Sequence, residues 1–202
     1  MKPIKKPSYL TAGLLALLLA QGAYFLAIGA WSELFVVLVA LVFSLVPYLV
    51  QPSYNLANSE SLRVGIVMFT IAALVLGEIH NFYATLPWWD SFLHFFAGIG
   101  LTALGYRWLF LLVRQESLSA KPIFHTLFVA TSATTVLVVW EIYEFTIDLL
   151  GWSSNRMQPS LSDTMIDIIV GMLGVTLAII AGYRMLDKQK KNVMHHLVQE
   201  EK

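Results

Sequence analysis

The amino-acid sequence predicts an all-α membrane protein, a polytopic bundle of about six transmembrane helices. Hydrophobic residues make up 57% of the 202-residue chain, charged residues make up 13%, and the mean hydropathy is +0.69. This composition supplies too little polar surface to cover a water-soluble domain. A hydrocarbon core about 30 Å thick takes roughly 20 apolar residues per helix, so a chain of this length can form about six crossings and little else. We therefore expect a single transmembrane helical domain over residues 1–202.

The apolar runs that would form these helices are separated by short polar breaks. They cover residues 9–31, 33–51, 62–84, 90–114, 122–149 and 163–186. A very tight connection at Trp31-Ser32-Glu33 predicts that the first two helices form an antiparallel hairpin. Pro52 and Pro87 punctuate the next breaks, as proline does at turns.

The first helix has a second interpretation. A basic start followed by an apolar stretch resembles a secretory signal, with small residues around Ala20 and Ala23 that could serve as a cleavage region within residues 1–23. The apolar run continues to Trp31, however, which is longer than the core of a signal needs. We therefore expect this helix to be retained.

Lysine and arginine indicate the orientation in the membrane. With the N-terminus in the cytoplasm, all of the 13 lysines and arginines except Arg156 fall inside or near the inner interface. Trp31, Trp88, Trp89 and Trp152 then lie at the outer interface, where amphipathic rings are enriched. Both patterns predict a multi-pass protein of the inner (plasma) membrane with both termini in the cytoplasm.

Acidic residues follow the opposite distribution and gather toward the outer ends of the helices. These residues are Glu78, Asp90, Glu141, Glu144, Asp148, Asp163 and Asp167. At about 100° per residue, Glu141, Glu144 and Asp148 fall within an arc of roughly 60° on one helix. Counting about 1.5 Å per residue from the outer end of that helix places Glu141 about 16 Å deep, near the bilayer centre.

Two further helices carry polar pairs with the same spacing. Asp90 and His94 lie one turn apart on one face of the fourth helix, and Asp163 and Asp167 do so on the sixth. Each helix therefore presents a polar stripe that runs inward from the outer surface. The pattern predicts a cavity that opens outward and reaches mid-membrane.

Ionisable groups at this depth are costly unless they face the bundle interior and are protonated, paired or bound to metal. Carboxylates and histidine at helical spacing are the ligands by which helix bundles hold divalent ions, and they suit Mg, Mn or Fe, with imidazole adding Zn. The candidate ligands are Asp90, His94, Glu141, Glu144, Asp163 and Asp167. A site that shares protons without metal and a merely structural polar network are the alternatives.

Several of these residues also have a structural interpretation. Ser160 and Asp163 have the spacing of a capping box, and Asp90 suits the positive N-terminus of its helix. His94 could simply pair with Asp90. Glu141, Glu144 and Asp167 lie too far inside their helices for such a role.

A second group of polar residues could extend the cavity, namely Glu78, His80, Asn81 and Asp148. Glu78 and His80 are about 200° apart around an α-helix, so both can line one cavity only if the third helix breaks near Asn81. Glu78 and Asn81 are the pair expected to face inward.

Three stretches resemble the YjdF family of bacterial inner-membrane proteins and, more distantly, the VanZ-like proteins. They are residues 90–98 (DSFLHFFAG), residues 140–145 (WEIYEF) and residues 163–167 (DTMID) followed by Gly171 and Gly174. The YjdF resemblance implies a small inner-membrane protein without an assigned reaction. The VanZ resemblance implies a link to glycopeptide-antibiotic tolerance and hence to the cell envelope.

These observations favour a metal-dependent membrane enzyme, a hydrolase or transferase, that acts on an amphiphilic envelope or lipid substrate. Glu141, Glu144 and Asp167 are the candidate catalytic residues, one of them left as general base for a water activated by the metal. Arg156 could bind a phosphate or carboxylate on the substrate. A transporter of divalent cations or protons is the first alternative, and a structural or regulatory membrane partner is the second. We expect the lipid bilayer as a partner and no nucleic acid.

Overall fold

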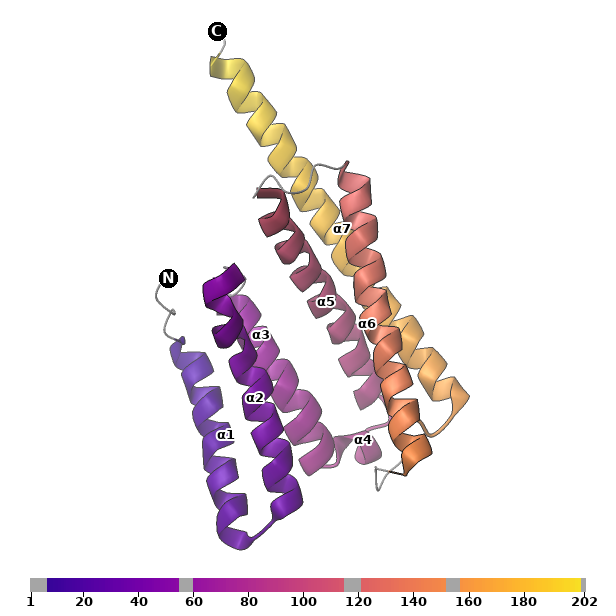
Figure 1. The fold of residues 1–202 in the computed structure, drawn as a ribbon. Coiled ribbons are helices and arrows are strands. Elements are labelled where there is room, and N and C mark those ends of the chain that lie inside the picture. Colours follow the sequence, from indigo (N-terminus) through magenta and orange to yellow (C-terminus); the bar gives the residue numbers. More distant parts are fainter. Residues whose placement is uncertain (1–6, 55–59, 115–120, 152–156, 201–202) are drawn as a thin grey trace. The chain divides into compact units, whose positions relative to one another are not determined.

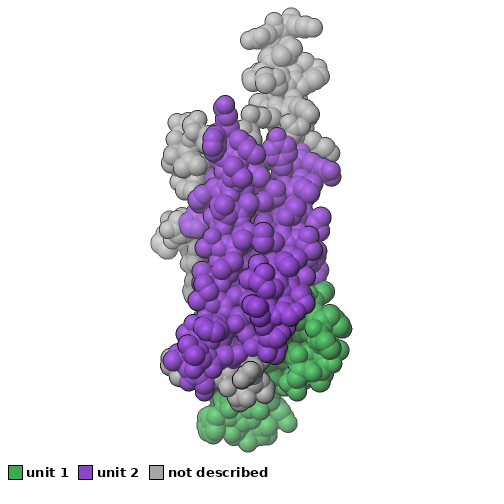
Figure 2. All heavy atoms as spheres, turned by 90° about the vertical axis from the view of Figure 1, so that its right-hand side faces the viewer, with its two compact units in different colours: residues 1–93 green, residues 94–202 purple. Residues whose placement is uncertain are grey.

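The computed structural model describes residues 7–54, 60–114, 121–151 and 157–200. Helices account for nearly all of these residues, and no strand occurs among them, which confirms the all-α fold class. Contacts within the chain divide it into two compact units, residues 1–93 and residues 94–202, which Figure 2 colours separately. The two units are described in turn.

Unit 1 begins with the predicted antiparallel hairpin. Helix α1 (Tyr9–Ile28) and helix α2 (Trp31–Tyr54) lie side by side (Figure 1), and they meet where Gly22 of α1 faces Val37 of α2. The turn itself lies earlier than predicted. Residue Gly29, with φ 72°, ends α1 in the left-handed conformation that glycine adopts without strain, and its N–H donates to the carbonyl of Leu26.

The third predicted helix is divided in three. Helix α3 (Glu60–Thr70) continues into a π-wound segment, η2 (Ile71–Ile79), which is followed by the short helix α4 (Phe82–Thr85). Between η2 and α4, Asn81 adopts a left-handed backbone with φ 59°. The helix therefore breaks at Asn81, the place where a break would be needed for Glu78 and His80 to face the same side. The apolar core of unit 1 joins Leu18 of α1, Ala40 of α2 and Val75 of η2.

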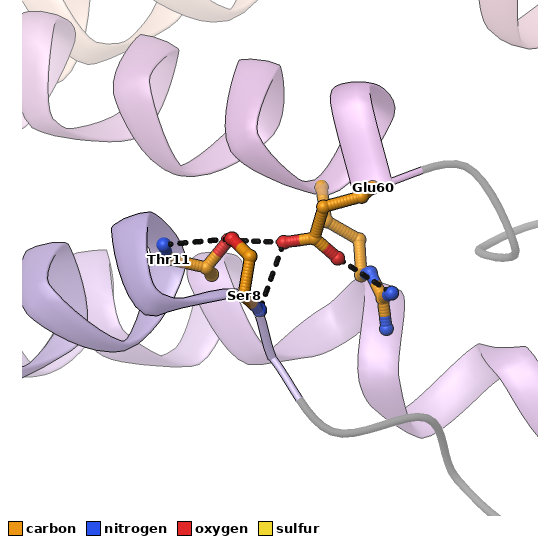
Figure 3. Close-up of polar contacts among 4 residues, drawn as sticks. Ser8, Thr11 and Glu60 are labelled. Atoms are coloured by element: carbon orange, nitrogen blue, oxygen red, sulfur yellow. Dashed lines mark hydrogen bonds and ion pairs between the residues drawn. The ribbon is translucent and has the colours of Figure 1, made fainter.

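A polar cluster joins α1 to α3 in unit 1 (Figure 3). The Glu60 carboxylate accepts hydrogen bonds from the Ser8 N–H (3.1 Å) and the Thr11 hydroxyl (2.6 Å) through one oxygen. Its other oxygen lies 2.6 Å from the guanidinium of Arg63, one turn further along α3. Arg63 is 2% exposed and also lies over the ring of Tyr48. Both oxygens of Glu60 therefore have donors, and one of these donors is a buried cation.

Unit 2 contains three long helices. Helix α5 (Trp89–Arg114) begins in the last residues of unit 1 and continues through unit 2, where helix α6 (Pro122–Leu150) and helix α7 (Leu161–Glu200) pack with it (Figure 1). Pro122 suits the first turn of α6, where its missing N–H needs no partner. Gly151, with φ 66°, ends the same helix.

Helices α5 and α7 approach one another at Gly98, Gly171 and Gly174. A Cβ atom at Gly98 would overlap the carbonyl oxygen of Gly171, and one at Gly174 would overlap the carbonyl oxygen of Phe95. Small residues permit this approach, which is the usual way that helices associate in membranes. The backbones of α5 and α7 are thus in direct contact one turn after His94 on α5.

Four of the described helical stretches are long and apolar enough to cross a membrane. They are Tyr9–Ile28, Glu60–Ile79, Ile123–Leu150 and Leu161–Arg184, and Trp31–Val46 is a shorter apolar stretch. Many large apolar side chains on these helices are exposed, including Phe35, Phe128 and Leu173, as expected for surfaces that face lipid. The structure therefore agrees with an all-α membrane bundle.

Candidate metal site

The polar residues predicted for the cavity gather in unit 2 from three helices. Helix α5 supplies His94, α6 supplies Glu141 and Glu144, and α7 supplies Asp167. The exposed fractions of these four residues are 4%, 4%, 5% and 2%. In a protein where much of the apolar surface is exposed, acids and a histidine are thus among the most deeply buried side chains.

Distances within this cluster are short. The Nε2 atom of His94 lies 3.4 Å from Oε1 of Glu141. One potential ligand atom from each of His94, Glu141 and Glu144 can be chosen so that all three lie within 4.8 Å of one another. Asp167 also brings a carboxylate oxygen within 4.8 Å of a ring nitrogen of His94. The helical spacing of Glu141 and Glu144 therefore aims both side chains at the same histidine.

Glu144 has a further partner on its own helix. The indole N–H of Trp140 donates to Oε1 of Glu144 at 2.7 Å, one turn away along α6. The Trp140 side chain is 48% exposed, and its ring also contacts that of Tyr143. Because an indole N–H in an apolar medium needs an acceptor, this bond satisfies Trp140 and holds one oxygen of Glu144 in place.

Gln158 contacts Glu141 of the cluster and was not identified from the sequence. Its amide nitrogen donates to Oε2 of Glu141 at 2.8 Å and to the Glu141 backbone carbonyl at 2.8 Å. Asp148 in turn accepts hydrogen bonds from the backbone N–H groups of Met157 (2.9 Å) and Gln158 (2.8 Å). Asp148, considered above as a cavity residue, thus anchors the segment that places Gln158 over Glu141. A neutral amide in a loop has no helical periodicity by which the sequence could have revealed it.

The two acids with a structural interpretation lie at helix starts, as expected. The Ser160 hydroxyl accepts from the Asp163 N–H at 3.2 Å, which confirms the capping contact at the start of α7. The Asp163 side chain nevertheless lies close enough to interact electrostatically with His94 and Asp167. Asp90 lies in the first turn of α5, one turn before His94, and falls within unit 1.

The remaining predicted residues lie elsewhere. Glu78, His80 and Asn81 are exposed and belong to unit 1. The π winding of η2 changes the angle between successive side chains, so the α-helical argument for an inward pair of Glu78 and Asn81 does not carry over to this segment. Arg156, the predicted substrate-binding residue, lies outside the described residues.

An apolar layer lies one turn before the cluster on α6 in unit 2. Leu137, one turn before Glu141, packs with Ala133 and with Val175 of α7, and these residues are 2%, 3% and 4% exposed. The hydroxyl of Thr102 lies in the same region but donates to the Gly98 carbonyl of its own helix at 2.8 Å. In the described part of unit 2, apolar packing rather than a polar track therefore lies next to the cluster on the side toward the start of α6.

Basic residues are scarce along the helices that carry the cluster. Between residues 122 and 183, Arg156 is the single lysine or arginine. The same stretch carries Glu141, Glu144, Asp148, Asp163 and Asp167. Buried carboxylates at such spacing hold protons or a cation, because their charges cannot otherwise be sustained in an apolar medium. An imidazole and several carboxylates are ligands that Zn, Mn and Fe all accept.

The fold and this cluster define an integral membrane protein whose apolar helices enclose acids and a histidine. The chain belongs to the family described as "Predicted membrane protein (DUF2238)", which matches residues 8–188 and so includes helices α1 to α6 and most of α7. This match confirms the resemblance to YjdF-like membrane proteins.

One curated relative comes from Thermotoga maritima. Over 100 residues the chain is 32% identical to a protein of that organism described as "Uncharacterized protein". The match covers 50% of this chain and 50% of the relative, so the chain spans about half the length of that protein. No solved structure matches the chain.

Proposed function

We propose that the cluster in unit 2 binds a divalent metal ion and that the protein uses this ion in a reaction on an amphiphilic envelope or lipid substrate. The ligands would come from His94, Glu141, Glu144 and Asp167, with Asp163 and Asp90 as further candidates. The observation that carries the proposal is the convergence of buried His94, Glu141 and Glu144 with ligand atoms within 4.8 Å of one another. A cation would offset the cost of burying these acids, and its binding would be favourable for the same reason.

Each protein group has a defined task in such a reaction. A bound divalent cation supplies a Lewis acid that polarises the substrate. Whichever of Glu141, Glu144 and Asp167 is not a ligand would accept a proton from the attacking water or hydroxyl. A substrate dissolved in the bilayer suits the site because helix α6, which carries both glutamates, also exposes apolar side chains such as Ile142 and Phe145.

The apolar layer of Ala133, Leu137 and Val175 favours this chemistry over transport. A carrier for cations or protons needs a polar route that continues inward, and these three residues are almost completely buried where the route would pass. Transport remains the alternative that a demonstrated flux of Mn²⁺ or H⁺ into proteoliposomes would support.

The proposal also includes a side of the membrane. We infer that the protein lies in the inner (plasma) membrane with both termini in the cytoplasm, so that the cluster is reached from the outer leaflet. Support comes from the lysines and arginines, of which Arg156 alone falls near the outer ends of the helices.

Metal analysis of the purified protein tests the proposal. We expect a divalent metal at about one ion per chain in the wild type after growth with Zn, Mn, Fe and Mg, and loss of that metal in Glu141→Gln, which keeps the shape of the side chain and removes its charge. Glu78→Gln is the matched control, because Glu78 is an exposed acid in unit 1. An absence of bound metal from the wild type under metal-replete conditions would overturn the proposal.

A further inference from the structure

Gln158 makes an unusual pair of contacts with one residue. Its amide nitrogen reaches both the backbone carbonyl and the Oε2 atom of Glu141, each at 2.8 Å. One amide group therefore ties the side chain of Glu141 to the backbone of the same residue. The carboxylate is held in one rotamer by a group that carries no charge and does not compete with it for a cation.

The consequence appears at the second oxygen of Glu141. Oε1 is buried, makes no hydrogen bond with any described residue, and lies 3.4 Å from Nε2 of His94. Since Gln158 occupies Oε2, the oxygen that faces the histidine is the one left available. A buried carboxylate oxygen without a donor is costly unless something binds it, so this atom marks where a cation would sit.

Gln158 is itself held in place from α6. Both carboxylate oxygens of Asp148 accept backbone N–H groups, one from Met157 and one from Gln158. Charge-assisted bonds of this kind are stronger than neutral ones. Asp148, which holds the backbone of Gln158, and Glu141, which accepts from its side chain, lie two turns apart on α6. One rigid helix therefore carries both contacts of Gln158.

We propose that Gln158, anchored by Asp148, is a positioning residue that orients the Glu141 carboxylate for cation binding. The inference rests on the cation site proposed above. Gln158 does not itself ligate the ion; it acts through Glu141, as groups that hydrogen-bond to metal ligands do in other proteins. A purely structural role, a cross-link between the α6–α7 connection and α6, predicts a loss of stability without a change at the site.

The affinity for Mn²⁺ distinguishes these roles, and electron paramagnetic resonance of the detergent-solubilised full chain measures it. We expect Gln158→Met, which keeps the length of the side chain but removes both donors, to weaken Mn²⁺ binding about 10-fold to 100-fold. It should also broaden the Mn²⁺ spectrum, because Glu141 becomes free to rotate. Asp148→Ala should act in the same direction with a smaller effect. Gln21→Ala removes an amide from α1 in unit 1 and is the control that should change neither quantity.

The outcomes separate the two proposals. If the wild type binds no Mn²⁺, both fail. If the wild type binds Mn²⁺ and Gln158→Met binds it with the same affinity and spectrum, the cation site stands and the positioning role of Gln158 is wrong. Thermal unfolding in EDTA checks that Gln158→Met is folded. If it is not, Gln158→Ala replaces it, since that change also removes both donors without adding bulk, and unchanged binding in Gln158→Ala would equally overturn the role.

Discussion

In unit 1 the Glu60 carboxylate lies 2.6 Å from the guanidinium of Arg63, whereas in unit 2 the Glu141 carboxylate is met by an imidazole and an amide. Both arrangements bury charged groups in an apolar bundle. The unit 1 cluster contains its own counter-charge, one helical turn away on α3. The residues one turn from Glu141 on α6 are Leu137, Val138, Glu144 and Phe145, none of them basic.

The difference separates an acid whose partners all come from the protein from an acid for which we propose a bound cation. Glu60 receives hydrogen bonds from Ser8 and Thr11 in addition to its ion pair, so its oxygens are occupied by the protein itself. Glu141 keeps one buried oxygen without a hydrogen bond from the described residues. Removing the charge of Glu60 should therefore lower the stability of the protein, whereas removing the charge of Glu141 should impair cation binding.

The largest effect is expected from Glu60→Ala. This change takes the carboxylate from a guanidinium that is 2% exposed and also removes the acceptor for Ser8 and Thr11. We expect the free energy of unfolding to fall by about 3 kcal/mol, toward the lower end for a broken buried pair because Glu60 is itself partly exposed. Chemical unfolding in detergent micelles measures it. Glu141→Gln, measured without metal, should show no such loss; an equal loss in both variants would remove the distinction between the two clusters.

Divalent cations should stabilise unit 2 and leave the unit 1 cluster unaffected. At a concentration of about 100 times the dissociation constant, Mn²⁺ should raise the free energy of unfolding of the wild type by about 2.7 kcal/mol. Glu60→Gln should keep this increment, since the cation site does not include Glu60, whereas Glu141→Gln should lose it. Thermal shift with and without EDTA is sufficient for the measurement. An increment that survives in Glu141→Gln would mean that the ion binds elsewhere.

Gly98→Ala should damage the site without altering any candidate ligand. The added Cβ overlaps the carbonyl oxygen of Gly171, so α5 must move away from α7, and with it His94 from Asp167. We expect a loss of about 2 kcal/mol in stability, typical of overpacking, together with weaker metal binding. Gly100→Ala is the matched control because no atom lies within 4 Å of its added Cβ. Similar behaviour of the two variants would show that the close approach of α5 and α7 does not set the site geometry.

Trp140→Phe should have the smallest effect. It removes the indole N–H that donates to Glu144 and keeps an aromatic ring on the exposed face of α6. We expect about 1 kcal/mol less stability and a modest loss of metal affinity, since the bond orients one ligand oxygen. Titration with Mn²⁺ beside chemical unfolding gives both values. A variant with unchanged affinity would show that the bond satisfies the indole N–H of Trp140 but does not orient Glu144 for metal binding.

The sequence predicted much of the fold because lipid imposes simple rules on it. Apolar length located the helices, and the glycines that permit the contact of α5 with α7 at Gly98 and Gly171 are visible in the sequence. The π winding of η2 was not predicted, because no residue type in this apolar segment marks it. The first turn was predicted at Trp31 rather than at Gly29, because the polar residues after Trp31 indicate a break in the apolar run and Gly29, which ends α1, lies inside that run.

The candidate site was predicted less evenly. Helical spacing identified His94, Glu141 and Glu144, because ionisable residues are conspicuous within apolar runs. Gln158 was not predicted, because it is neutral and lies in a connection, and neither were Glu60 and Arg63, because charged residues are ordinary at a helix start. Their acid and base spacing of three residues on one helix could have identified the pair.

The two hydrogen bonds of Asp148 also make the connection between α6 and α7 a closed loop of chain, fastened where Met157 and Gln158 return to the helix. The entropy lost in closing a loop grows slowly with its length, by about 0.6 kcal/mol for each doubling. An epitope tag inserted between Gly151 and Met157 should therefore be tolerated while the fastening holds. Antibody access to that tag in intact cells would then show from which side of the membrane the carboxylate cluster is reached.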